Sequence, residues 1–210
     1  MEWTGSERIL VLGGSRGLGA ELVAQLRKLG HQAETLSRKS SWSADFSKRE
    51  TWPEILQQVR EWEPQRLIYS AGGGPYGPFS KFQWKNHEWA LRVTFEFPAY
   101  LLHSLQQNPL SSLGQVVVVG SSVAEAKPDP GAASYCAAKH ALRGLIGSLQ
   151  QEQPLFDLRL WSPGYMQTEL LPLQSEPRRA GLARDPREVA SLMIQSISDP
   201  ALKLRNLSLD

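Results

Sequence analysis

Residues 9–19 read ILVLGGSRGLG, a run of four apolar residues followed by a glycine-rich turn. The apolar run has no polar alternation, which predicts a short strand buried on both faces, as in a parallel sheet. Leucines then recur at helical spacing from Leu18 to Leu29, and Gly30 ends this predicted helix. A strand, a glycine turn and a helix thus follow one another directly.

The same alternation of apolar runs and helical patterns continues along the chain. Further strands are predicted at 32–37, 67–70, 116–119, 158–161 and 203–209, and further helices at 50–62, 84–107 (interrupted by Pro98), 134–151 and 188–197. This pattern predicts an α/β fold with a single doubly wound parallel sheet of Rossmann type, helices on both faces, and one domain over residues 1–210. Ligands of such folds bind at the carboxyl ends of the strands, and a long loop at 164–186 follows one such end.

Composition and charge exclude several classes of protein. The 23 Lys and Arg residues nearly balance the 21 Asp and Glu residues, and the net charge of +2 gives no broad field for nucleic acid or anionic lipid. Cys136 is the only cysteine and the histidines have no paired metal-ligand spacing, so we expect no disulfide and no metal site. The polar start and the lack of an apolar run of about 18 residues predict a cytoplasmic protein without a membrane segment.

The glycines of the first turn, Gly13, Gly17 and Gly19, have the spacing GxxxGxG. This spacing differs from GxGxxG and lacks the Gly-Lys-Ser/Thr of a P-loop. Glycines at this point let the backbone approach a pyrophosphate, and the N-terminus of the following helix offers unpaired N–H groups and a positive dipole end. A tight structural turn is the alternative explanation, and the strand-turn-helix context favours nucleotide binding.

Tyr135 and Lys139 are four residues apart at the start of a predicted helix, so both side chains lie on one helix face. Ser122 follows the carboxyl end of the predicted strand 116–119, where that face can meet it. A tyrosine has a pKa near 10 in water, and a neighbouring ammonium group such as that of Lys139 lowers it. Ser122 can then hold a carbonyl oxygen. The alternative is a half-buried ring beside a solvated amine.

Six motifs occur in order along nearly the whole chain, each at a predicted strand end. They are Leu12-Gly13-Gly14-Ser15-Arg16-Gly17-Leu18-Gly19, Asp45-Phe46, Ala71-Gly72, Ser121-Ser122, Tyr135-Cys136-Ala137-Ala138-Lys139 and Pro163-Gly164-Tyr165-Met166-Gln167-Thr168. Together they resemble the short-chain dehydrogenase/reductase family, in its short, non-extended type. Six ordered motifs are far more specific than a single glycine pattern.

The resemblance implies roles for individual residues. Tyr135 would exchange a proton with the substrate oxygen, Lys139 would lower the pKa of Tyr135 and bind the nicotinamide ribose, and Ser122 would orient the carbonyl. The residues implied in cofactor binding are Gly13, Ser15, Arg16, Gly17, Leu18, Gly19, Ser37, Arg38, Asp45, Phe46, Ala71, Gly72, Lys139, Pro163, Gly164 and Thr168. Asp45 would contact the adenine amino group, although it can also cap the helix that follows it.

Three features depart from the family pattern. Tyr69-Ser70 replace the paired asparagines that usually precede Ala71-Gly72, a change that we expect to affect stability more than hydride transfer. Thr94 occupies the place of an asparagine that supports a water-linked proton relay to the lysine, so we expect a weaker relay. The sequence ends at Asp210, without the additional substrate-binding segments of many members, which predicts a shallow pocket or one completed by a second copy.

The end of the second predicted strand distinguishes the two nicotinamide cofactors. NAD-selective folds carry an acidic residue there to bind the ribose 2′-hydroxyl, whereas NADP requires a cation. This chain has Ser37-Arg38 at that place, and Arg16 of the glycine turn can converge on the same phosphate. Glu34 is a counter-argument, but it comes three residues before the strand end. We therefore predict NADP(H), with the alternative that both arginines are merely exposed charges.

The sequence thus predicts an NADP(H)-dependent oxidoreductase that interconverts a carbonyl and a hydroxyl on a small-molecule substrate. The alternative is a cofactor-binding regulatory or scaffold protein of the same fold with little or no turnover. Residues 73–79, 123–127 and 165–173 are expected around the nicotinamide, but they do not identify the substrate. Among them Tyr76, Phe79 and Leu170 can also be ordinary loop anchors.

A homodimer or homotetramer is expected, because the family commonly packs the helices that match 84–107 and 134–151 against their copies. Small residues at Ala133, Ala137, Ala141 and Gly144 would let such helices approach closely. The alternative is that this stripe of small residues packs on the protein's own sheet.

Overall fold

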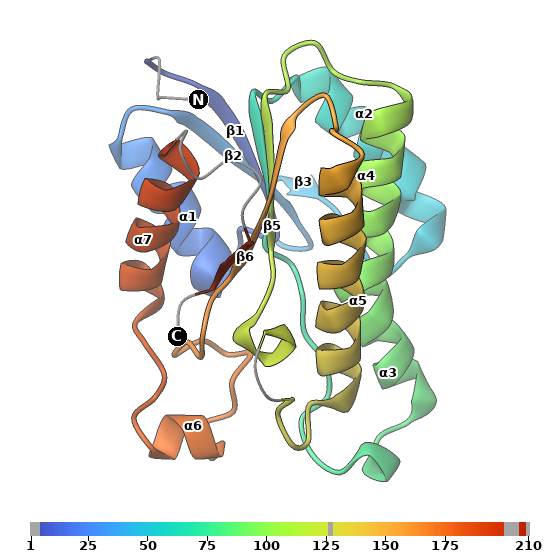
Figure 1. The fold of residues 1–210 in the computed structure, drawn as a ribbon, viewed down its shortest axis with the longest axis vertical. Coiled ribbons are helices and arrows are strands. Elements are labelled where there is room, and N and C mark those ends of the chain that lie inside the picture. The colour runs from blue at the N-terminus through green and yellow to red at the C-terminus, as the bar shows by residue number, and fades with distance from the viewer. Residues whose placement is uncertain (1–4, 126–127, 200–205, 209–210) are drawn as a thin grey trace.

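The computed structural model describes residues 5–125, 128–199 and 206–208. Within these residues lies a seven-stranded parallel sheet with the order β3-β2-β1-β4-β5-β6-β7 (Figure 1). The strands are β1 (Arg8–Leu12), β2 (Gln32–Ser37), β3 (Trp42–Ser43), β4 (Arg66–Tyr69), β5 (Gln115–Val119), β6 (Asp157–Ser162) and β7 (Asn206–Ser208). The chain builds outward from β1 to β3, then crosses back and builds outward from β4. The predicted doubly wound fold is confirmed, with its switch point between β1 and β4.

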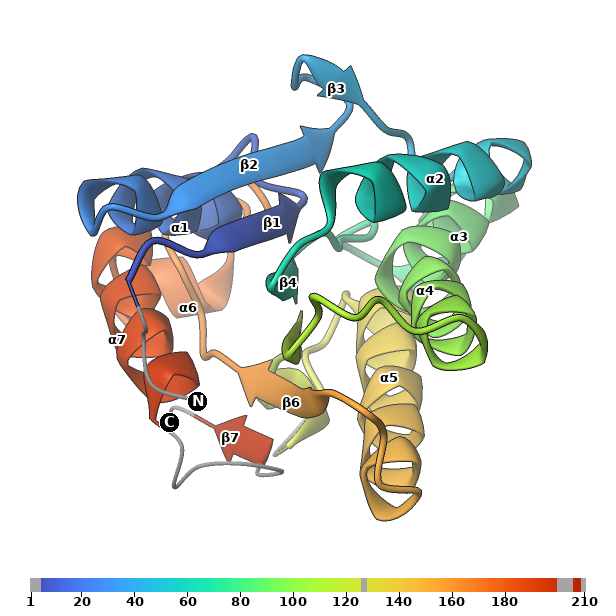
Figure 2. The same ribbon diagram turned by 90° about the horizontal axis from the view of Figure 1, so that it is seen from above.

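Helices cover both faces of the sheet (Figure 2). One face carries α1 (Gly17–Lys28) and α7 (Pro186–Ser198), and the other carries α2 (Trp52–Trp62), α4 (Phe97–Gln107) and α5 (Ala133–Gln151). α3 (Trp84–Leu91) runs into α4 through a π-helical turn at Arg92–Glu96, and α6 (Glu176–Arg179) is a single turn that follows β6. Short 3-10 turns stand at Arg49–Thr51, Phe79–Lys81 and Ser122–Ala124.

Alternate residues of the central strands face the two helical layers. Ile9 and Val11 of β1 pack in the core with α1 and α7, whereas Leu10 and Leu12 pack in the core with α2, α4 and α5. All four side chains are fully buried. Burial on both faces therefore explains why residues 9–12 form an uninterrupted apolar run.

The elements differ from the sequence prediction where the chain lacks a periodic pattern. The two-residue strand β3 and the single turn α6 are not predicted, because both are too short to show a period. The helix predicted over 84–107 is interrupted at 92–96, ahead of Pro98. Of the predicted last strand 203–209, β7 covers 206–208, and the other positions lie outside the described residues. No helix in the described parts of the chain is long and apolar enough to cross a membrane.

The stripe of small residues on α5 is exposed in the single chain. Ala133, Ala137, Ala141 and Gly144 all lie on the solvent side of the helix, while residues such as Leu142 pack toward the sheet. The alternative that the stripe packs on the protein's own sheet is therefore wrong. Self-association through the stripe stays a prediction.

The π-helical turn leaves one main-chain carbonyl without a helical partner. The N–H of Phe97 donates to Arg92 O, five residues back, and so is not available to Val93 O. The next candidate partner of Val93 O is the nitrogen of Pro98, which carries no hydrogen. The buried hydroxyl of Tyr69 donates to Val93 O instead, at 2.5 Å. Tyr69, a departure from the family pattern, thus satisfies a carbonyl that the helix cannot.

The variant Tyr69→Phe removes this donor and keeps the ring. We expect it to lower the free energy of unfolding by about 1–3 kcal/mol, because a buried carbonyl is left unsatisfied. Urea unfolding followed by circular dichroism measures the loss. Tyr100→Phe is the matched control, since Tyr100 packs its ring on Trp52 and no described residue hydrogen-bonds its hydroxyl. Equal losses in the two variants would contradict the assignment.

Candidate functional site

A cleft of about 540 Å³ opens beside the switch point, at the carboxyl ends of the strands. All of the residues that the sequence assigns to the cofactor line this cleft, namely Gly13, Ser15, Arg16, Gly17, Leu18, Gly19, Ser37, Arg38, Asp45, Phe46, Ala71, Gly72, Lys139, Pro163, Gly164 and Thr168. Residues of the first turn and of the loop after β6 therefore meet at one site. The structure brings the set together, while the role of each residue stays a prediction.

Two glycines of the first turn are required for different reasons. Gly13 has φ +97°, and a Cβ there would lie 2.6 Å from the backbone nitrogen of Ala71, so the turn packs directly on the end of β4. Gly17 has φ +52°, and a Cβ there would lie 3.1 Å from Thr168 Cγ2 in the loop after β6. The tight-turn explanation thus holds for both glycines, and Gly17 in addition lets the loop after β6 approach the start of α1.

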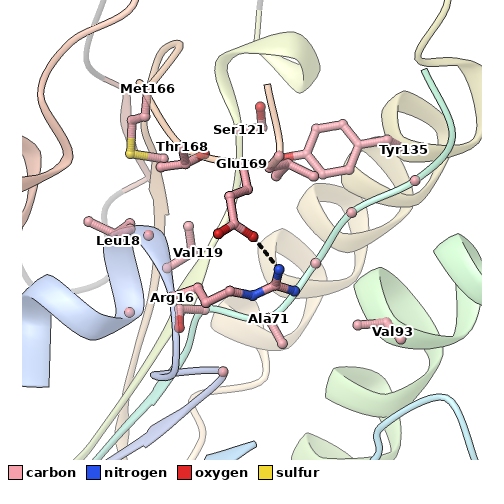
Figure 3. Close-up of a pocket in the computed structure, with 18 of the residues that line it drawn as sticks. Arg16, Leu18, Ala71, Val93, Val119, Ser121, Tyr135, Met166, Thr168 and Glu169 are labelled. Carbon is pink, nitrogen blue, oxygen red and sulfur yellow. Dashed lines mark hydrogen bonds and ion pairs between the residues drawn. The ribbon is translucent and has the colours of Figure 1, made fainter. Parts of the chain in front are cut away.

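An ion pair joins the two walls of the cleft (Figure 3). Arg16, from the glycine turn, pairs with Glu169, from the loop after β6. Their side chains are 49% and 72% exposed, so the pair adds little stability and another anion can replace Glu169 at small cost. Sequence reasoning finds Arg16 and misses Glu169, because a contact between such distant positions leaves no local pattern.

Arg38 and Asp45 line the same cleft beyond the end of β2. Asp45 Oδ1 accepts hydrogen bonds from the N–H of Ser47 at 3.0 Å and from its hydroxyl at 2.7 Å. Burial disfavours the charge of Asp45, but the Ser47 bonds and the Arg38 guanidinium hold the pKa of this carboxyl below its usual value. Asp45 therefore supports the turn that follows it and also faces the cleft.

Tyr135 and Lys139 both reach the cleft from α5, as their spacing predicts. Lys139 is only 3% exposed, and its Nζ donates to Val119 O at the end of β5, at 2.5 Å. The same nitrogen lies 5.6 Å from the centre of the Tyr135 ring. The carboxyl end of β5 thus holds the ammonium group beside the tyrosine.

Ser121 and the predicted Ser122 both line a small hollow that also contains Tyr135. Ser121 also lines the cleft, and its hydroxyl acts to lower the pKa of Tyr135, which lies near it (Figure 3). Ser121 is extended, with φ −168° and ψ 144°, and a 3-10 turn begins at Ser122. The role of Ser122 in orienting the carbonyl stays a prediction.

Burial dominates the titration of the tyrosine and the lysine. It raises the pKa of Tyr135 to about 12, against the opposing effect of the Ser121 hydroxyl. It lowers the pKa of Lys139 to about 7. The predicted lowering of the tyrosine pKa by Lys139 is therefore not found, since the ammonium donates to Val119 O and not to the phenol oxygen. At neutral pH Tyr135 keeps its proton and is able to donate it.

Thr94 lies in the π-helical turn, fully buried beside the cleft. Its hydroxyl donates to Gly73 O at 3.2 Å and accepts from the Gly73 N–H at 3.1 Å. A Cβ on Gly72 would lie 3.5 Å from both Thr94 Oγ1 and Lys139 Nζ, so the two groups flank that glycine. The single hydroxyl proton of Thr94 is engaged by Gly73. A weaker proton relay at this position stays a prediction.

A smaller hollow of about 80 Å³ adjoins the cleft and shares Ser121 and Tyr135 with it. The three stretches predicted around the substrate, 73–79, 123–127 and 165–173, all contribute residues to its lining. Lys127, within the second stretch, lies outside the described residues. Asp129 also lines the hollow, although sequence reasoning did not select it.

Other residues of the predicted substrate region hold the surrounding loops instead. Phe79 stacks on His87 with 4.3 Å between the ring centres, and Glu125 pairs with an arginine of α5 at 2.7 Å. Neither lines the cleft or the hollow, so Phe79 is a loop anchor. Tyr76 and Leu170, in contrast, line both spaces.

Comparison with known proteins gives relatives in sequence. The sequence model of the short chain dehydrogenase family matches residues 31–178. The cyclic-di-GMP-binding biofilm dispersal mediator protein of Escherichia coli (strain K12) is 24% identical over 157 residues, which cover 69% of this chain and 65% of that protein. Across three such relatives the match spans between 52% and 65% of their length.

Solved structures are similar in fold over nearly the whole chain. BdcA in complex with NADPH has a TM-score of 0.81 at 18% identity, with 98% of this chain and 93% of that chain covered. A 4-hydroxyisoleucine dehydrogenase complexed with NADH has a TM-score of 0.81 at 19% identity, with 98% and 97% covered. At these identities the likeness shows a shared fold.

The family match and the geometry agree with each other. The match begins at β2 and ends within α6, and it includes Ser121, Tyr135 and Lys139 of the cleft. It extends over more than half of the 210 residues. This chain therefore belongs to the short-chain dehydrogenase/reductase family.

Proposed function

We propose that this protein is an NADP(H)-dependent oxidoreductase that interconverts a carbonyl and a hydroxyl on a small-molecule substrate. The observation that carries the proposal is the meeting of Ser121, Tyr135 and Lys139 at a cleft that is also lined by the glycine turn. A proton donor, a hydrogen-bonding hydroxyl and a buried cation thus share one wall with a nucleotide-sized groove.

The residues present fit a nicotinamide dinucleotide. The glycine turn lines the cleft, and the N-terminus of α1, which begins at Gly17, suits a pyrophosphate. Arg38 would pair with a 2′-phosphate, since no acidic residue stands at the end of β2. Similar structures hold NADPH in one case and NADH in another, so the preference for NADP(H) rests on Arg38 and on Arg16.

In the reduction, the hydride comes from the cofactor and the proton comes from the protein. A nicotinamide cofactor, when bound in its reduced form, would supply a hydride, with its two electrons, to the carbonyl carbon. Tyr135 donates its proton to the carbonyl oxygen, while the hydroxyls of Ser122 and Ser121, which line the hollow with Tyr135, orient that oxygen. The product is the alcohol, and the phenolate left on Tyr135 is stabilised by the Lys139 ammonium and regains a proton from water.

A cofactor-binding regulator with little turnover is the second candidate. Thr94 favours it, because its hydroxyl is engaged by Gly73 where an asparagine would support the proton relay. A relative named as a cyclic-di-GMP-binding protein is in keeping with a regulatory role. Cofactor binding without turnover would select this candidate, so one assay separates the two.

Turnover depends on the Tyr135 proton in the first candidate. We expect NADPH oxidation with members of a panel of small ketones and quinones, and a fall in kcat of at least about 10²-fold in Tyr135→Phe. Cofactor affinity, measured by fluorescence titration, should stay nearly unchanged. Tyr100→Phe is the control variant. Tight cofactor binding with no turnover across the panel would reject the enzyme proposal.

Cofactor preference depends on the two arginines. We expect NADPH to bind more tightly than NADH by about 1.5–3 kcal/mol, the value of hydrogen bonds to a charged group. Arg38→Asp should weaken or reverse this preference, and Arg16→Ala should reduce it. Fluorescence titration of both cofactors measures the difference. Equal affinities in the unmodified protein would overturn the assignment.

Lys139 makes stability depend on pH. Its pKa is about 7 in the folded protein and about 10.5 when unperturbed. Between these values the unfolded chain holds a proton that the folded protein has lost, so the free energy of unfolding rises with pH. We expect the free energy of unfolding of the unmodified protein, relative to Lys139→Met, to increase from pH 7 to pH 10. Urea unfolding of both proteins measures this. A difference in the free energy of unfolding that stays constant with pH would contradict the lowered pKa of Lys139.

A further inference from the structure

The hollow beside Ser121 and Tyr135 is lined by two chemically different sets of residues. One set contains the groups proposed to act on the carbonyl. Another part of its lining contains Asp129 with the aromatic residues Tyr76 and Tyr165. Among the described lining residues, Asp129 is the one that carries a charge. Val123, Ala132, Leu170 and Leu171 complete a mostly apolar wall.

Asp129 precedes α5 in a turn that fixes its backbone. Its carbonyl accepts from the Ala132 N–H at 3.2 Å. Its carboxylate makes no ion pair with any described residue, and Tyr165 beside it acts to lower its pKa. Asp129 is half-buried and lines the hollow.

Negative charge predominates around this carboxylate. Burial and the charge of Glu176 on α6 raise the pKa of Asp129, and Tyr165 opposes the rise. Burial and the charge of Asp129 raise the pKa of Tyr76, where Arg179 acts in the opposite sense. The Glu176 carboxylate and the Arg179 guanidinium therefore act on this part of the hollow from outside its lining, and Asp129 is the charged group within it. A donor group, above all a cation, would relieve the repulsion.

We propose that Asp129 selects substrates that carry a hydrogen-bond-donating group near the reacting carbonyl, and that it prefers an ammonium group to a hydroxyl group. This inference rests on the proposed function, because it assigns the substrate class of the same site. The carboxylate would accept from the donor while the carbonyl oxygen lies between Ser121 and Tyr135. A carboxylate-bearing substrate would be repelled.

The size of the hollow limits the substrate. A volume of 80 Å³ holds roughly five water-sized groups. The donor group and the carbonyl therefore belong to a short chain. Four ketones provide a matched series in which one terminal group changes: 2-pentanone, 4-hydroxy-2-butanone, 4-amino-2-butanone and 4-oxopentanoate.

The experiment measures kcat/KM for each ketone with NADPH and the full chain. We expect kcat/KM for the hydroxyl and ammonium ketones to exceed that for 2-pentanone by roughly ten- to a hundredfold, because a hydrogen bond to a charged group contributes about this much. The value for 4-oxopentanoate should be the lowest. Asp129→Asn keeps the size and removes the charge, so it should abolish the preference for the ammonium ketone. Asp129→Leu should favour 2-pentanone.

Two control variants isolate the role of Asp129. Glu176→Gln should weaken the preference for the ammonium ketone. The preference for the hydroxyl ketone should stay unchanged. Glu152→Gln, at the other end of α5, should change neither. Circular dichroism establishes that each variant is folded.

Binding of the corresponding alcohols in the presence of NADP, measured by calorimetry, separates the two proposals. If the alcohols bind with different affinities in the expected order but no ketone is reduced, the role of Asp129 is supported and the enzyme proposal is rejected. Turnover that does not distinguish the four ketones, or a preference that survives in Asp129→Asn, overturns the role of Asp129 and leaves the enzyme. Absence of both binding and turnover overturns both.

Discussion

The carboxyl ends of β1 and β4 approach so closely that the first residue after β1 cannot carry a side chain. A Cβ on Gly13 would collide with the backbone of Ala71, whose N–H donates to Leu12 O at 3.1 Å. Gly13 in turn donates to Leu36 O of β2 at 2.8 Å. The turn is thus held between its two neighbouring strands, and the N-terminus of α1 is set over the switch point. The cleft exists because this contact holds the turn against the sheet and clear of the space above the strand ends.

Burial gives the site its chemical character. Lys139 and Tyr135 lie on one helix, and the same low-dielectric surroundings move their pKa values in opposite directions. Displaced pKa values in a cleft are typical of acid-base sites, where the protonation states must differ from those in water. The cost is a buried ammonium with one backbone carbonyl as partner. Stability is therefore reduced at the point where the proposed chemistry requires a cation.

The departures from the family pattern are connected through the π-helical turn at 92–96. Tyr69 binds the carbonyl of Val93, which the π turn and Pro98 leave without a helical partner. Thr94, one residue further, binds both backbone groups of Gly73. These changes in β4, in the loop after it and in the turn before α4 form one local structure. Turns of this kind are frequent at functional sites, and here the turn lies between the cleft and the core.

The sequence by itself determined the sheet, the glycine turn and the Tyr135–Lys139 face, because each depends on one short segment. The strands are uninterrupted apolar runs, the turn is a cluster of glycines, and the helix face is a spacing of four residues. The charge pattern of the sequence also selected Arg38 and Arg16. Only the tertiary structure decided that Ser121 joins Ser122 in the lining beside Tyr135, that Glu169 pairs with Arg16, and that Asp129 lines the hollow. These facts depend on the direction of a side chain after a strand end and on loops far apart in the chain. The pKa values depend on burial, which is a property of all the surrounding elements together and leaves no mark in the spacing of residues.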